Sequence, residues 1–355
     1  MTRWTRLLWQ APAAAALAWA TWNLFDWGVW RAVFRPDLAA CQALERQGAC
    51  WGVVPAKLTQ WLFGHYPSEL QFRPALALAL WGLSLAMWLW PLLAPPPGVR
   101  PTLRNGLGLR LAAAGLALGG LAVLHGSDAL GLAAWRTVDS RAWGGLALTV
   151  LLSLGALVLS VPLALLLAHG RLSPHRLRAG AATLAIETVR GAPLVMWLFM
   201  GAFLLPAVLP EAWTPGPVGR TLLVMTVFSA AYMAEILRGH LSVIAREQDE
   251  AAEVLGASRW ARWRLVVWPQ ATRGALPALT GHVIGLIKDT ALVMIVSLQD
   301  LTGAMSMSLN GDADWRPFFL EAYLFIAAIY AVLCLCVARL GQQLELRYPV
   351  HRHLG

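Results

Sequence analysis

Charged residues are scarce in this chain of 355 residues, where they make up only 13% of the sequence. Lysine occurs twice, at Lys57 and Lys288. A soluble domain devotes about a quarter of its residues to charge, whereas 58% of this chain is hydrophobic. The net charge of +9 does not indicate nucleic-acid binding, because the basic residues lie between apolar runs and not on one patch. The composition predicts an integral membrane protein.

Motifs for chemistry are also missing. There is no Gly-x4-Gly-Lys-Ser/Thr loop, so the chain does not itself bind ATP by that route. A catalytic cluster would need to come from His125-Gly126-Ser127-Asp128 or from Asp312-Ala313-Asp314, and each of these looks like a periplasmic loop. We therefore expect no enzyme, no metal site and no cofactor.

Long apolar runs are what the chain has in abundance. A helix that crosses the hydrocarbon of a bilayer needs about 20 mostly apolar residues. Eight runs qualify as predicted spans, at roughly 8–29, 75–94, 106–124, 143–168, 180–208, 220–240, 275–297 and 318–338. The first resembles a signal peptide in its Ala-rich core. Its continuation through Trp22, Phe25, Trp27 and Trp30 favours a retained helix with an interfacial aromatic belt.

Arginine sorts the connecting segments by side. The N-terminus, the 95–105, 169–179 and 241–274 links and the tail all carry arginine, and alternating spans would place them on one face. The positive-inside rule predicts that this face, with both termini, is cytoplasmic. The 31–73 loop is an exception on the opposite face, since it holds five basic residues. Longer loops follow the rule less strictly.

Four cysteines are too few for a disulfide scaffold. Cys334 and Cys336 lie in an apolar run and are interpreted as buried thiols. Cys41 and Cys50 lie in the 31–73 loop, which is predicted to be periplasmic, where disulfides persist. Two interpretations of this pair stay open: a Cys41–Cys50 bridge, or two free or buried thiols.

The 241–274 link is the longest predicted cytoplasmic segment and has an unusual polar pattern. Acidic residues come first, around Glu250, and three arginines follow at Arg259, Arg262 and Arg264, which complements a helix dipole. Ala251, Ala252 and Leu255 form a small apolar face, and Gly256 allows a turn. Such a helix could enter a groove on a partner, or it could be an ordinary amphipathic interfacial helix.

Three groups of charges lie within or at the ends of predicted spans. Glu187 and Arg190, and likewise Glu235 and Arg238, are three residues apart and share a helix face. Lys288-Asp289-Thr290 are expected in the middle of the seventh span. A charge in the bilayer costs roughly 2.5–3.5 kcal/mol, so each should be paired or line a cavity. The charges either meet an amino acid in transit or hold helices together, and pairing within each Glu-x-x-Arg favours the second interpretation for those two pairs.

These motifs resemble a known family. Glu250-Ala251-Ala252-x3-Gly256, followed by Val266-x-Trp268-Pro269, is similar to the cytoplasmic coupling loop of bacterial ABC importer permeases. The runs that begin at Glu187 and Ser229, with Lys288-Asp289-Thr290, look like the permeases for polar amino acids. The 31–73 loop, with Cys50-Trp51-Gly52 and Gly64-His65-Tyr66-Pro67, resembles the extended permeases for general L-amino acids.

The resemblance implies an all-α polytopic membrane protein. It would have a type I ABC importer permease core of five helices at 143–347, an N-terminal extension of about three transmembrane helices at 1–142, and a short cytoplasmic tail at 348–355. The implied location is the bacterial inner membrane.

The resemblance also implies partners: two ATPase subunits, a second related permease, a periplasmic amino-acid-binding protein and membrane lipid. Glu250, Ala251, Ala252 and Gly256 would couple to the ATPase. Three positions before the motif, Ala245, Glu247 and Asp249, depart from the family pattern, as does Ala291 after Lys-Asp-Thr. The alternative is a secondary transporter or channel without an ATPase, which would predict inverted repeats of spans; no convincing repeat is present.

Overall fold

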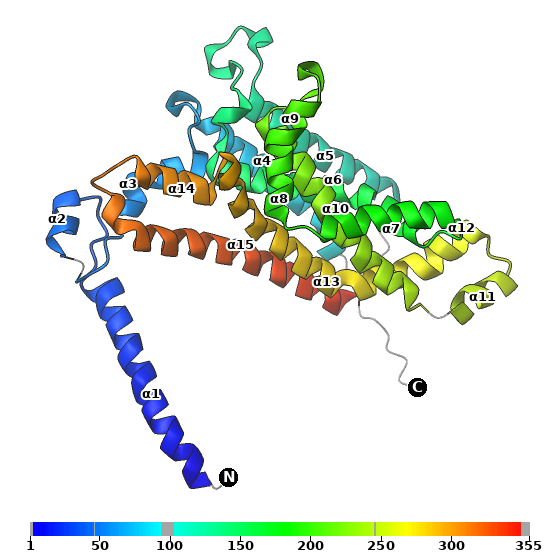
Figure 1. Cartoon of the computed structure of the whole chain (residues 1–355), viewed down its shortest axis with the longest axis horizontal. Coiled ribbons are helices and arrows are strands. Elements are labelled where there is room, and N and C mark those ends of the chain that lie inside the picture. The colour runs from blue at the N-terminus through cyan, green and yellow to red at the C-terminus, as the bar shows by residue number, and fades with distance from the viewer. Residues whose placement is uncertain (1–2, 46, 94–102, 245, 349–355) are drawn as a thin grey trace. The chain divides into compact units, whose positions relative to one another are not determined.

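The computed structural model describes residues 3–45, 47–93, 103–244 and 246–348, and this part of the chain is almost entirely helical (Figure 1). It divides into two compact units. The first joins Met1–Trp61 to Met305–Ile329, and the second joins Leu62–Ala304 to Tyr330–Gly355. Three helices, α3 (Val53–Phe63), α14 (Leu301–Asn310) and α15 (Phe319–Arg347), have residues in both units.

The first unit is built on the N-terminal extension. Helix α1 (Arg3–Phe25) runs into a π-helical turn (Asp26–Trp30) and is followed by α2 (Leu38–Ala43) and α3. Three polar contacts tie this stretch to the chain 250 residues later. The backbone N–H of Cys50 donates to Glu321 Oε1 at 2.9 Å. Lys57 Nζ donates to Asp312 at 2.6 Å, and Trp61 Nε1 donates to Ser308 Oγ at 2.7 Å. The hydrogen bond from Lys57 lowers the pKa of the Asp312 carboxyl.

A disulfide closes the loop between α2 and α3. Cys41 and Cys50 are bonded, with their Cα atoms 5.4 Å apart, and both residues are buried. Cys41 lies in α2, which Asp37 caps by accepting a hydrogen bond from the backbone N–H of Ala40 at 3.1 Å.

The state of this pair can be tested by counting thiols. The denatured, unreduced protein should show two reactive thiols, from Cys334 and Cys336, and reduction should expose two more, from Cys41 and Cys50. Cys41→Ser/Cys50→Ser is the matched variant, and its count should stay at two with or without reductant. Four reactive thiols in the unreduced wild type would contradict the bridge.

The second unit holds the helices α4 (Phe72–Leu93), α5 (Leu103–His125), α6 (Gly145–Arg171), α7 (Arg176–Arg190), α8 (Leu194–Phe199), α9 (Leu205–Val208), α10 (Pro217–Ser242), α11 (Arg246–Val254), α12 (Arg259–Arg262) and α13 (Trp268–Asp289). A π-helical turn (Met200–Leu204) joins α8 to α9, and another (Trp263–Val267) joins α12 to α13. A 3-10 helix (Thr290–Val296) and a two-residue strand β1 (Gln299–Asp300) follow α13.

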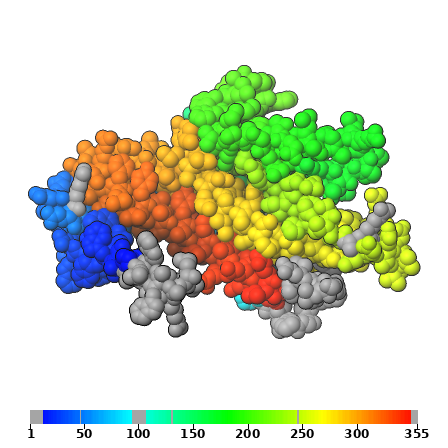
Figure 2. All heavy atoms as spheres, turned by 60° about the horizontal axis from the view of Figure 1, so that its bottom comes forward, coloured from blue at the N-terminus to red at the C-terminus, as the bar shows by residue number. Residues whose placement is uncertain are grey.

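Helices α6 and α10 of this unit pack closely through small and large apolar side chains. α6 lies against α10, with Leu152 and Ala156 of α6 and Met225 of α10 in one core cluster. A second cluster holds Ala164 of α6 and Ala230 of α10. Small residues of this kind let membrane helices approach each other. Figure 2 shows α13 and the C-terminal half of α15 side by side, and Gly341 of α15 lies so near Thr280 that a Cβ would overlap it.

Within the described ranges, six helical segments are long and apolar enough to cross a membrane, namely Ser68–Leu93, Leu107–His125, Gly145–Arg171, Pro217–Ser242, Arg259–Val296 and Arg316–Arg347. They correspond to six of the eight predicted spans. The first predicted span, at 8–29, is helical over Arg3–Phe25, yet α1 is not among the helices that meet this criterion within the described residues.

The predicted span at 180–208 is not a single straight helix. The structure has two helical pieces, Arg176–Arg190 and Leu194–Val208, bent by 98°. The break falls at Gly191-Ala192-Pro193. Pro193 has no N–H to donate, and its ring disfavours helical backbone at the residue before it. A bent pair of this kind counts as one broken span or as a re-entrant loop, so the described residues hold six candidate spans or seven.

Candidate functional site

The Glu250-Ala251-Ala252-x3-Gly256 motif forms a helix and its C-terminal cap. Gly256 has a φ of +79°, the left-handed region that favours glycine. Its N–H donates to Glu253 O at 2.8 Å, and the N–H of Ala257 donates to Ala252 O at 3.1 Å. These two bonds make a Schellman motif with glycine at the C′ position. The spacing between Ala252 and Gly256 is therefore the spacing that this cap requires.

The end of α11 presents apolar side chains to the surroundings. Val254 is 88% exposed and Leu255 is 87% exposed, and Ala251 is exposed beside them. Two adjacent, exposed, branched side chains at a helix end form a small apolar patch, whereas isolated exposed apolar residues are common on any surface. This surface is the part of the motif that is available to a partner.

The acidic start of α11 is partly neutralised within the chain. Arg262 of α12 pairs with Asp249 at 3.4 Å and also with Glu253. Gln270 of α13 donates to Gln248 Oε1 at 2.5 Å. These contacts tie α11 to the following helices and use Asp249, one of the positions that depart from the family pattern. Ala245, another of them, lies outside the described residues.

A second cluster of charges joins three helices, with Arg171 at its centre. Arg171, in the last turn of α6, pairs with Glu187 of α7 at 2.8 Å and with Glu235 of α10 at 2.7 Å. Glu235 also pairs with Arg238 at 2.7 Å, so pairing within that Glu-x-x-Arg was predicted correctly. The sequence places Arg171 in the 169–179 link and indicates no partner for it, because no local pattern points to carboxylates 16 and 64 residues away.

The expected pairing of Glu187 with Arg190 was wrong. Glu187 is held by Arg171, and the guanidinium of Arg190 lies over the ring of Tyr232 at 5.4 Å from its centroid. Nε of Arg190 is buried and has no hydrogen-bond partner in the part of the chain that the structure describes. The Tyr232 ring stacks in turn on His282, whose Nε2 is 2.8 Å from Ser229 Oγ.

Lys288-Asp289-Thr290 lie within the membrane-length segment Arg259–Val296. They stand where α13 ends and the 3-10 helix begins, with Lys288 exposed and Thr290 buried. Thr290 Oγ1 donates to Ile287 O at 2.7 Å and lies 3.4 Å from the hydroxyl of Tyr330. Tyr330 donates to the buried Asp300 at 2.9 Å. Burial raises the pKa of Asp300, a residue that sequence reasoning did not single out.

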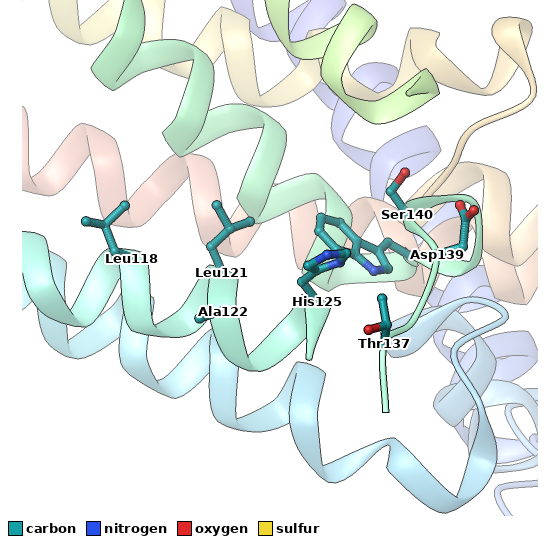
Figure 3. A pocket seen from close by; sticks show the side chains of 8 residues that line it. Leu118, Leu121, Ala122, His125, Thr137, Asp139 and Ser140 are labelled. Carbon is teal, nitrogen blue, oxygen red and sulfur yellow. The ribbon is translucent and has the colours of Figure 1, made fainter. Parts of the chain in front are cut away.

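Two cavities have other linings. One, of about 750 Å³, is lined by Leu118, Leu121 and Ala122 of α5, by His125 and Trp143, and by loop residues Thr137, Asp139 and Ser140 (Figure 3). The other, of about 330 Å³, lies between α8 to α9 and α10 and is lined mostly by apolar side chains such as Trp197 and Phe228. Neither is lined by the predicted pathway charges.

Comparison with known proteins decides the family. Residues 160–348 match the model of the binding-protein-dependent transport system inner membrane component. This chain belongs to that family. The glutamate/glutamine/aspartate/asparagine transport system permease protein BztC of Rhodobacter capsulatus is 33% identical in an alignment 387 positions long that covers 95% of this chain and 87% of BztC. The inner membrane amino-acid ABC transporter permease protein YhdY of Escherichia coli is 33% identical over 86% of this chain and 80% of its own length.

The fold is also that of the family. A crystal structure of an amino acid ABC transporter with histidines matches with a TM-score of 0.51 and 29% identity, over 57% of this chain and 92% of the other. This chain is thus a type I ABC importer permease with additional N-terminal helices. It is a transport subunit of a bacterial inner-membrane importer and not an enzyme. ATP hydrolysis belongs to separate subunits, and the family implies ATPase and binding-protein partners.

Proposed function

We propose that this permease carries polar L-amino acids from the periplasm into the cytoplasm. The observation with most weight is the likeness to BztC and YhdY, which spans both the family core and the N-terminal extension. By this proposal a heterodimer with a second, related permease sits on two ATPase subunits and receives substrate from a periplasmic binding protein. Both termini are cytoplasmic, as the arginine distribution indicates, and α11 couples the permease to an ATPase.

We assign the substrate path to the neighbourhood of Arg190, with Lys288, Asp289 and Thr290 as further candidates. Arg190 is the strongest because its Nε is buried and unbonded, so an incoming carboxylate could satisfy it. Tyr232 holds the guanidinium in place from one side. Glu187, Glu235 and Arg238 are engaged in the Arg171 cluster, so in our proposal they support the helices around the path and do not meet the cargo.

The test is reconstitution from native membranes. An ATPase subunit should co-purify with this chain, and the assembled complex should take up labelled glutamate, glutamine or a related polar amino acid when binding protein and ATP are supplied. Arg190→Gln should lower uptake about tenfold or more, since a charged hydrogen bond contributes about 1.5–3 kcal/mol. Arg190→Lys should recover part of the rate, because it keeps the charge but loses the planar fork.

Arg176→Gln is the matched control, because Arg176 is exposed on the same helix as Arg190. Its uptake should equal that of the wild type. An Arg190→Gln complex that assembles and transports at the wild-type rate would remove Arg190 from the path. Uptake without any co-purifying ATPase would favour a secondary transporter and defeat the proposal as a whole.

A further inference from the structure

The segment directly after the coupling helix carries a stack of three tryptophans. The rings of Trp260 and Trp263 lie 5.3 Å apart at 17°, and those of Trp263 and Trp268 lie 5.2 Å apart at 22°. The stack runs from α12 into the first turn of α13. It does not bury its outer end, because Trp260 is 64% exposed. An indole ring that stacks on a neighbour and is still mostly exposed can contact a molecule outside the chain.

Two arginines flank this open end. Arg259 and Arg264 are exposed, and neither has a carboxylate partner among the described residues. The third arginine of the segment, Arg262, is turned inward to Asp249 and Glu253 of α11. Positions two residues apart on a helix differ by about 200°, so Trp260 and Arg264 lie on the side away from Arg262. With Leu265, which is 72% exposed, Arg259, Trp260 and Arg264 make up what we term the tryptophan–arginine patch.

The length of the helix to which the patch belongs places it at the membrane surface. The stretch Arg259–Val296 has 38 residues and is apolar enough to be a span. At about 1.5 Å per residue it reaches nearly 57 Å, well beyond the roughly 30 Å of a hydrocarbon core. At least one of its ends therefore extends beyond the hydrocarbon core, into or past the headgroup layer. Tryptophan and arginine together are the side chains typical of that layer.

We propose that the tryptophan–arginine patch binds anionic phospholipid in the cytoplasmic leaflet. The guanidinium groups of Arg259 and Arg264 would hold the phosphate, and Trp260 and Leu265 would lie against the upper acyl chains. Because Arg262 ties the same turn to α11, the bound lipid fixes the height of the coupling helix above the membrane. The cytoplasmic side of the patch rests on the orientation given in the proposed function.

Lipid binding can be measured without transport. The assembled transporter, in micelles of a neutral detergent, is titrated with phosphatidylglycerol that carries bromine on its acyl chains, and quenching of tryptophan fluorescence is followed. Each arginine near an anionic surface contributes about fivefold in binding. Arg259→Gln/Arg264→Gln should therefore raise the phosphatidylglycerol fraction at half-maximal quenching by about 25-fold, and each single variant by about fivefold. Brominated phosphatidylcholine should quench much less at equal fractions.

The matched control is Arg176→Gln/Arg178→Gln, which removes the same charge from exposed positions on α7. This pair should shift the midpoint by less than about twofold. Equal shifts in both double variants would reduce the effect to net charge and overturn the site. So would release of the ATPase by Arg259→Gln/Arg264→Gln with unchanged phosphatidylglycerol binding, since the patch would then be an ATPase contact. The titration needs neither ATP nor an amino acid, so its outcome is independent of whether the proposed cargo is correct.

Discussion

Gly256→Asp should abolish uptake while the permease still inserts into the membrane. The φ of +79° suits only glycine well, with asparagine and aspartate the best tolerated replacements. Nothing in the described structure lies within 4 Å of a Cβ built at this position, so no internal clash results. The new carboxylate would instead project beside the exposed Val254 and Leu255, where the ATPase contacts the helix in our proposal. An unpaired charge in a closed interface costs several kcal/mol.

Gly256→Asn is the control because it has the same shape and the same tolerance of the left-handed region without the charge. We expect Gly256→Asn to keep most of its uptake and its ATPase, and Gly256→Asp to lose both, as measured by uptake in vesicles and by ATPase co-purification. If both variants lose the ATPase, the loss comes from the disturbed left-handed backbone at position 256 and not from the new charge at the surface. If Gly256→Asp transports normally, α11 does not couple.

Arg171→Gln should give the largest loss of stability among single changes to the charged clusters. Arg171 is 20% exposed, and its removal leaves Glu187 without its partner and Glu235 with only Arg238. We expect the free energy of unfolding to fall by about 1 kcal/mol, because the Glu187 carboxylate that loses its partner is half exposed and water replaces part of the lost interaction. Thermal unfolding of the purified protein in detergent would show this as a lower melting temperature.

Two companion variants isolate the cause. Arg176→Gln, at an exposed arginine five residues along the chain, should leave the melting temperature within the small range usual for surface changes. Arg171→Gln placed in a Glu187→Gln background should cost less than in the wild type, because the carboxylate that would lose its partner is already gone. Equal melting of Arg171→Gln and Arg176→Gln would show that the cluster adds nothing to stability.

Local patterns in the sequence were enough for the spans and for the cap of α11. Apolar runs near 20 residues long gave the positions of six membrane-length helices, since crossing a bilayer depends on the length and apolar character of a local run. The spacing from Ala252 to Gly256 is set by hydrogen bonds within six residues, so the turn at Gly256 was predictable as well.

Contacts between distant helices were not predictable in the same way. Arg190 lies one helical turn after Glu187 and is the partner that local spacing indicates. The ion pair forms with Arg171 instead, and this depends on how α6 and α7 pack. Thr290, Tyr330 and Asp300 meet although 10 to 40 residues separate them. Pro193 indicates a break at Gly191-Ala192-Pro193, but the apolar residues on both sides make 180–208 resemble a single span.

The contacts of the N-terminal extension limit how this protein can be shortened. Glu321 is only 6% exposed and receives its hydrogen bond from the backbone of Cys50, while Asp312 and Ser308 receive theirs from Lys57 and Trp61. A chain cut down to the stretch that the family model matches would strand these acceptors, one of them a buried carboxylate. The extension therefore cannot be removed without leaving polar groups of the 305–329 segment unpaired. A permease shortened in this way would need new residues at positions 308, 312 and 321.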